Sequence, residues 1–298
     1  MLAAMIVVEL IDRYRGFDIV TRRIKTRDPR SLLWIVSWVT FFLSSVIDNL
    51  TSTIVMISLV QRLISNKDVR LMFAGIIVIA ANAGGAWTPI GDVTTTMLWI
   101  GGQITAAGVM KSLFLPSVAC LLIPLVFLST RLKNTVIEDL AANDDRKSKI
   151  DLATLLFFFG ILMAVGALES MNILSDLATW LNQTIKSQTV IITIVGLMSA
   201  VIDNVPLVGA SMAMYPVDNF MWEYLAYCAG TGGSILIIGS AAGVAAMSLE
   251  KIDFIWYLKK VSVLALIGYL AGCGIYLLLN EHCRRHRKYS YQDCHLRS

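Results

Sequence analysis

Residues 44–49 read SSVIDN, and residues 199–204 read SAVIDN, so five of the six positions are identical. A second pair of blocks follows. ANAGG at 81–85 precedes IGD at 90–92, and AGTGG at 229–233 precedes IGS at 238–240. The spacing inside this second pair is the same in both copies. The sequence is therefore internally duplicated, and each copy carries an Asp-Asn pair followed by a glycine-rich segment.

Both copies lie in a strongly apolar chain. Of its 298 residues, 56% are hydrophobic and 15% are charged, and the mean hydropathy is +0.69. A soluble domain carries about 25% charged residues, so this composition excludes one. Seven runs almost free of charge approach the roughly 20 residues that span a bilayer: Leu32–Ile47, Leu71–Trp87, Leu113–Thr130, Leu152–Leu168, Val190–Ile202, Tyr224–Ile238 and Ile255–Asn280. We expect an all-α polytopic membrane protein.

The basic residues predict how the two copies are oriented. Basic-rich connections mark the cytoplasmic side of a membrane protein, which places 12–30, 61–70, 131–151 and 250–260 inside. The connections at Lys111, Lys186 and Pro216 then lie outside. The first Asp-Asn block falls between two inside connections and the second between two outside ones, so the copies are inverted. The tail at 281–298 is the exception, because it falls outside despite its five basic residues.

Inverted copies with interrupted helices are typical of secondary transporters, which build their site at the bilayer midplane. The apolar arms around each Asp-Asn pair have 11–16 residues and reach about 17–24 Å, less than the roughly 30 Å hydrocarbon core. We therefore expect two re-entrant hairpins. Glycine pairs and Pro89 predict two broken helices downstream of them. The expected parts are repeat 1 at 1–130, a cytoplasmic linker at 131–151, repeat 2 at 152–280 and the basic tail.

The two ends of the chain carry separate expectations. Met1–Leu10 is apolar but too short to span, and has neither a basic leader nor a cleavage site. We interpret it as the last turns of a helix whose beginning is absent. The tail holds all three histidines, but a short basic segment offers no folded metal site. We expect the tail to be disordered.

Three aspartates stand inside apolar runs, where an ionised carboxylate costs several kcal/mol: Asp48, Asp92 and Asp203. A lone aspartate before an apolar helix is as readily explained as a helix cap. Three of them on matched interrupted segments favour a cation site, because protons and Na⁺ or Li⁺ can compete for a buried carboxylate. Hard cations prefer oxygen ligands, which nearby side chains could add: Asn49, Thr51, Thr88, Thr94, Thr95, Ser199, Asn204, Ser234 and Ser240.

Two runs resemble the NhaD-type sodium/proton antiporters. Residues 41–53, FFLSSVIDNLTST, are similar to that family's first hairpin, and residues 80–99, AANAGGAWTPIGDVTTTMLW, are similar to its broken helix. The resemblance extends from about Ala4 to Leu279. It implies ion binding or proton exchange at Asp48, Asn49, Asn82, Asp92, Thr94, Thr95, Ser199, Asp203 and Asn204. It also implies supporting acids at Glu9 and Glu169 and weaker assignments at Ser234 and Ser240.

The primary hypothesis is exchange of cytoplasmic Na⁺ or Li⁺ for external H⁺ by alternating access. Asp48 and Asp203 would be the titrating ligands, and Asp92 would couple the broken helix to them. The alternatives are a sodium-coupled dicarboxylate carrier, an arsenite carrier, or an inactive truncated fragment. We expect no enzyme activity, no cofactor and no nucleic acid partner. The expected partners are the lipid bilayer, small cations and a second copy of the chain. The membrane would be the bacterial inner membrane by default, with the plastid envelope as the alternative.

Overall fold

The computed structural model describes residues 28–132, 187–212 and 219–295, together with residues 160, 163, 167, 171 and 185. This part of the chain contains helices and no strands. The helices are α3 (Pro29–Val46), α4 (Asn49–Leu63), α5 (Lys67–Ala86), α6 (Val93–Ile100), α7 (Ala106–Arg131), α10 (Gln188–Met198), α11 (Asn204–Met212), α12 (Asn219–Gly232), α13 (Ala241–Glu250), α14 (Phe254–Tyr257), a π-helical turn (Leu258–Ser262) and α15 (Val263–His295).

Four stretches of the described chain are long and apolar enough to cross a membrane: Pro29–Val46, Lys67–Ala86, Ala106–Arg131 and Phe254–Asn280. The prediction of an all-α polytopic membrane protein is thereby confirmed. The window in α5 is 89% buried within the protein, against 44–50% for the other three. Helix α5 is therefore the central helix of the bundle, and the others shield it from lipid.

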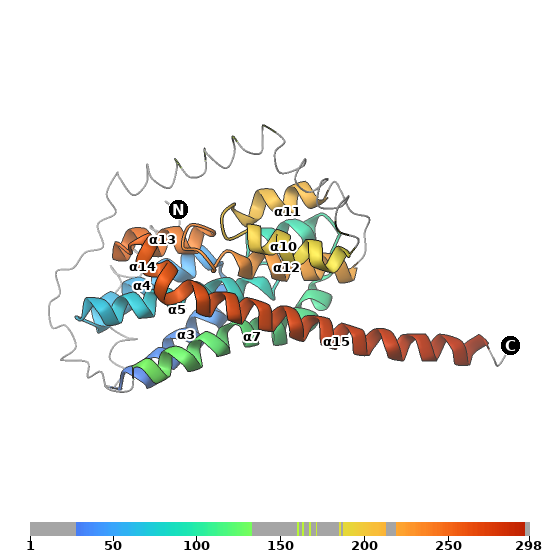
Figure 1. Ribbon diagram of the computed structural model, residues 1–298, viewed down its shortest axis with the longest axis horizontal. Helices are drawn as coiled ribbons and strands as arrows, with labels where there is room; N and C mark the ends of the chain where they lie inside the picture. Colours follow the sequence, from blue (N-terminus) through green and yellow to red (C-terminus); the bar gives the residue numbers. More distant parts are fainter. Residues whose placement is uncertain are drawn as a thin grey trace.

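The described elements of the two copies follow in the same order and share several helix contacts. Helices α3 to α7 match α10 to α13 and α15. Helix α3 packs on α5 as α10 packs on α12, and α4 packs on α13 as α11 packs on α6. Helices α7 and α15 lie side by side (Figure 1). Each hairpin thus packs on the half-helix of the other copy, so the two copies are interlocked.

Hydrogen bonds repeat this correspondence. The Ser44 hydroxyl donates to the Ala81 carbonyl at 2.6 Å, and the matching Ser199 hydroxyl donates to Ala229 at 2.7 Å. Next to them, glycines permit close helix contact. A Cβ on Gly84 would overlap the carbonyl oxygen of Phe41, and one on Gly232 would overlap that of Gly196. The first arm of each hairpin is therefore pressed against the broken helix of its own copy.

The first hairpin has one arm longer than expected. Asp28 caps α3 by accepting from the Ser31 backbone N–H at 3.2 Å, and Pro29 occupies the first turn, where its missing N–H costs nothing. The arm therefore starts three residues before the apolar run and has 18 residues. The second arm, α4, has 15 residues and reaches only about 22 Å, as a re-entrant segment requires.

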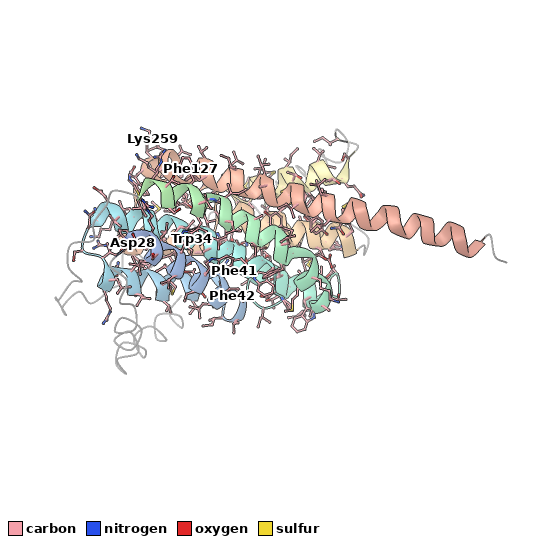
Figure 2. The ribbon with its side chains drawn as sticks, turned by 90° about the horizontal axis from the view of Figure 1, so that it is seen from below. Asp28, Trp34, Phe41, Phe42, Phe127 and Lys259 are labelled. Atoms are coloured by element: carbon pink, nitrogen blue, oxygen red, sulfur yellow. The ribbon has the colours of Figure 1, made fainter. Side chains whose placement is uncertain are left out.

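Aromatic side chains show which face of α3 packs inward. Figure 2 labels Trp34, Phe41 and Phe42 along this helix. Phe41 is fully buried and stacks on Trp87, at the start of the α5–α6 break, with ring centroids 6.0 Å apart. Phe42 is 49% exposed. The hairpin arm therefore presents one apolar face to the break and another to the surroundings, where lipid would solvate it.

The ends of the elements agree with the charge map. Asp28, Phe127 and Lys259 lie at the same end of the bundle (Figure 2), and each is next to or within a connection predicted to be cytoplasmic. Helix α15 runs from that end past the other (Figure 1), so the basic tail remains the exception. The prediction of a disordered tail was wrong as far as His295, because α15 continues through that residue as a helix. The structure gives no boundary for the linker at 131–151, which lies almost wholly outside the described residues.

Candidate functional site

The site lies where both broken helices are interrupted. Helix α5 ends at Ala86, and Asp92 starts α6 by accepting from the Thr94 backbone N–H at 2.9 Å. Helix α12 ends at Gly232, and Ser240 starts α13 by accepting from the Gly243 N–H at 3.1 Å. Both predicted broken helices are therefore present, and the residue that restarts each one is Asp92 in the first copy and Ser240 in the second.

Asp92 is the centre of the site. Its carboxylate is 2% exposed. It accepts the side-chain amide of Asn49 at 3.0 Å and that of Asn204 at 3.2 and 3.4 Å. These asparagines begin α4 and α11, the second arms of the two hairpins. One carboxylate is therefore held by the tips of both hairpins.

Asn82 of α5 joins this carboxylate to the second broken helix. Its side-chain oxygen accepts from the Asn49 amide at 3.1 Å. Its own amide donates to the hydroxyls of Ser234 and Ser240, both at 2.9 Å. Asn82 is fully buried, and both serines are 2% exposed. A continuous hydrogen-bonded network thus runs from Ser240 through Asn82 and Asn49 to Asp92, and crosses from one copy to the other.

Helix ends add a second electrostatic contribution. The N-termini of α4, α6, α11 and α13 all begin at residues of this network or next to them. Each N-terminus carries about half a positive charge, which offsets part of the cost of a buried carboxylate. The site can therefore hold one negative charge inside an apolar bundle without a basic side chain.

Asp48 and Asp203 differ from Asp92 in position. Asp48 caps α4, and its carboxylate accepts from the Thr51 backbone N–H at 2.7 Å and from the Thr51 hydroxyl at 2.6 Å. Asp203 faces the backbone N–H groups of Asn204 and Val205, and is near enough to Asp92 for the two charges to interact. Both are partly exposed. The equal roles expected for Asp48 and Asp203 stay a prediction, but the geometry places Asp92 at the centre.

The remaining expected residues fall into three groups. The Thr94 hydroxyl donates to the Asp92 carboxylate at 3.0 Å and belongs to the network. Thr88, Thr95 and Ser199 donate to backbone carbonyls, those of Ser45, Asp92 and Ala229, and so support the surrounding backbone. Glu9 and Glu169 lie outside the described residues.

Ser52 is a buried residue of α4 that the sequence did not single out. Its hydroxyl is fully buried and has no hydrogen-bond partner, whereas Thr53 and Ser58 of the same helix donate to carbonyls one turn earlier. Ser52 follows Asn49 by three positions and therefore shares its helix face. That spacing was the available signal for a further oxygen near the network.

The donor set defines what the site can bind. Carboxylate, amide and hydroxyl oxygens suit a hard cation, and no group of three His, Cys, Asp or Glu side chains that could hold a metal occurs among the described residues. Asn49 and Asn204 point amide N–H groups at Asp92. An amide has an oxygen on its other side, so a rotation of each side chain would offer that oxygen to a cation bound at the carboxylate.

Comparison with known proteins gives consistent matches. The family model described as citrate transporter (CitMHS) matches residues 1–230. Sodium/proton antiporter 1 of Arabidopsis thaliana is 43% identical, with 94% of this chain and 61% of the relative aligned. Sodium/proton antiporter 2 of the same plant is 41% identical, covering 94% and 84%. The Na(+)/H(+) antiporter NhaD of Vibrio cholerae is 30% identical, covering 94% and 77%.

Two facts about length accompany these matches. The chain covers 61% of the length of the first Arabidopsis relative. The alignments extend over 352–372 positions, more than the 298 residues of the whole chain. The relatives therefore contain residues, within the aligned region, that have no counterpart here.

Proposed function

The chain belongs to the citrate transporter (CitMHS) family and to the NhaD-type sodium/proton antiporters. We propose that it exchanges Na⁺ or Li⁺ for H⁺ across a membrane. The observation that carries the proposal is the buried carboxylate of Asp92, which accepts hydrogen bonds from the tips of two inverted hairpins. Such a group is within reach of both hairpins, as alternating access requires.

The exchange would follow from competition for negative charge. Burial in the apolar interior disfavours the ionised form of Asp92, and when Asp203 is ionised as well, the repulsion between the two charges adds to that cost. Either a proton or a bound alkali cation relieves that repulsion, so binding of one favours release of the other. Na⁺ entering from the cytoplasmic side would displace the proton, and a proton entering from the other side would displace Na⁺. No cofactor and no chemical change of the substrate is needed, so we propose a carrier without enzyme activity.

Citrate is the rival substrate, because it names the matching family model. A tricarboxylate requires positive side chains to neutralise it. The side chains hydrogen-bonded to Asp92 are Asn49, Thr94 and Asn204, none of them basic, and the central charge is negative. The charge of the described site therefore favours a cation.

Reconstitution of the full chain into liposomes tests the proposal. With an acidic lumen and a pH-sensitive dye, we expect added Na⁺ or Li⁺ to dissipate the pH gradient, and added K⁺ or choline to leave it in place. Uptake of labelled citrate or arsenite in the same vesicles should stay at the level of empty liposomes. If the pH gradient persists when Na⁺ is added and citrate is taken up, the proposal is overturned. If the vesicles transport none of these substrates, the chain is an inactive fragment.

Removing either hairpin-tip amide should weaken cation binding. We expect Asn49→Ala and Asn204→Ala each to raise the Na⁺ concentration at half-maximal exchange by about tenfold, because each deletes one ligand that is worth roughly 1.4 kcal/mol. The control is Asn280→Ala, since Asn280 donates only to the Tyr276 carbonyl of its own helix, at 3.0 Å. Equal half-saturation for all three variants would exclude the hairpin tips from the site.

The chain is an integral membrane protein, and we propose the plastid envelope as its membrane in place of the bacterial inner membrane expected by default. The support is the higher identity to plant relatives, 43% and 41%, than to the NhaD of Vibrio cholerae, 30%. Fractionation of plant cells expressing the tagged chain should recover it with envelope membranes. Its recovery with another membrane would overturn the assignment.

A further inference from the structure

A buried ion pair lies at the C-terminal end of α13, which is the end away from Ser240 and the Asp92 site. The Arg70 side-chain Nε is 3.2 and 3.1 Å from the two carboxylate oxygens of Glu250. The side chains are 12% and 2% exposed. Arg70 stands in the first turn of α5, and Glu250 is the last residue of α13. The pair therefore joins the central helix of one copy to the half-helix of the other.

Other contacts make this a multipoint attachment. The Arg70 guanidinium also donates to the carbonyls of Ile64 and Ser65, at 3.3 and 3.4 Å, just after α4 ends. The Gln61 amide of α4 donates to the Leu249 carbonyl at 3.1 Å. After Glu250 the chain turns sharply, because Lys251 adopts a left-handed φ of 52°. A side chain other than glycine keeps that conformation only where its surroundings hold it.

Helix α13 is thereby fixed to α5 at both ends. Its first end is held by Asn82, which donates to Ser240. Its other end is held by Arg70, twelve residues earlier on α5. Ser240 and Glu250 are about 15 Å apart along α13, so the two helices run antiparallel. The ion pair therefore sets how far α13 can slide along α5, and so where Ser240 lies relative to Asn82.

Among the described residues, the far end of α6 in the first copy makes no matching ion pair. The repeat spacing that matches Asp92 to Ser240 matches Glu250 to Gly102. Helix α6 ends at Ile100 and is followed by two glycines, of which Gly102 has a φ of 77°. Neither glycine has a side chain that could bind α12. The described structure thus anchors the far end of α13 by an ion pair and leaves the far end of α6 without one.

We propose that Arg70 and Glu250 are positioning residues for cation binding. They hold Ser240 against Asn82, and Asn82 in turn orients the Asn49 amide toward Asp92. The pair does not contact the cation; it fixes the network through α13. This inference rests on the proposed sodium/proton exchange only for its transport measurement.

The experiment uses the full chain and two independent measurements. Glu250→Gln keeps the size and one acceptor but removes the charge. We expect the Na⁺ concentration at half-maximal exchange to rise about fivefold, within the range for coupling through packed elements, while the maximal rate stays the same. We also expect faster hydrogen exchange at the backbone amides of Gly243 and Val244, with unchanged exchange at residues 94–96 of α6. The double variant Arg70→Glu with Glu250→Arg should recover part of both losses.

The control is Asp253→Asn, three positions after Glu250, where the exposed carboxylate only caps α14. It should leave both measurements at the wild-type values. If Glu250→Gln speeds amide hydrogen exchange only near residues 248–252, or changes neither the hydrogen exchange nor the transport measurement, the proposal is wrong. Should that variant fail to fold, Gln61→Ala removes one attachment without leaving a buried charge, and the same criteria apply. Wild-type protein without exchange activity would refute the proposed function, while hydrogen exchange would still decide the positioning role.

Discussion

Asp92→Asn should reduce sodium-dependent dissipation of the pH gradient by at least about 100-fold, the loss expected when a buried charge that contributes about 3 kcal/mol to cation binding is removed. The substitution keeps the size of the side chain. It also keeps one oxygen that can accept from Asn49 or Asn204, which donate to the carboxylate at 3.0 and 3.2 Å. The loss would therefore reflect missing negative charge. Proteoliposomes with matched protein content provide the measurement.

Asp28→Asn is the matched control. Asp28 is also an aspartate at a helix N-cap, but it is exposed and lies at the surface end of α3. Asparagine caps a helix about as well as aspartate, so transport should be unchanged. If Asp92→Asn transports at the wild-type rate, Asp92 has no role in the mechanism, and Asp48 and Asp203 remain as the candidate titrating ligands.

Gly232→Ala should destabilise the protein by about 3 kcal/mol or more, because overpacking against backbone cannot be relieved by a rotamer change. A Cβ at this position would overlap the carbonyl oxygen of Gly196. The neighbouring bond from Ser199 to the Ala229 carbonyl, at 2.7 Å, holds the same two helices together. We expect the Tm in detergent to fall by about 10 °C. Gly84→Ala, against Phe41, should have the same effect in the other copy.

Gly274→Ala tests whether that loss is due to the contact. Gly274 lies in α15, and a Cβ there would meet no atom within 4 Å. Alanine in a helix interior is favoured over glycine by about 1 kcal/mol, so the Tm should stay the same or rise. A wild-type Tm for Gly232→Ala would mean that α10 and α12 can separate without cost.

Much of this fold could be predicted because the sequence is duplicated, so that a motif in one copy supports the interpretation of its counterpart in the other. The Asp-Asn blocks predicted the hairpin tips, and the glycine blocks with Pro89 predicted both broken helices. The cross-packing of α4 on α13 and of α11 on α6 was beyond reach, since it depends on contacts between residues far apart in sequence. The helical tail was not predicted because its many charged residues leave no apolar period to detect.

The composition of the site could be predicted, but the roles within it could not. Asp48, Asp92 and Asp203 all precede apolar helices, so the sequence presents three equivalent N-caps. The distinction arises in space, where the carboxylate of Asp92 meets two asparagines and that of Asp48 meets only Thr51. The ion pair of Arg70 with Glu250 could not be predicted from the sequence either, because its partners are 180 positions apart.

The unequal pair of Asp92 and Ser240 has a consequence for the rate in each direction. In a carrier built from two identical inverted halves, the inward-open and outward-open forms are related by a two-fold rotation and have equal free energy, so transport runs equally well in both directions. Here the only carboxylate of the matched pair belongs to the first copy. If the chain exchanges ions as proposed, we expect the two forms to differ in free energy and the empty protein to have a preferred resting orientation. We expect rectification: at equal and opposite gradients, flux in one direction exceeds flux in the other.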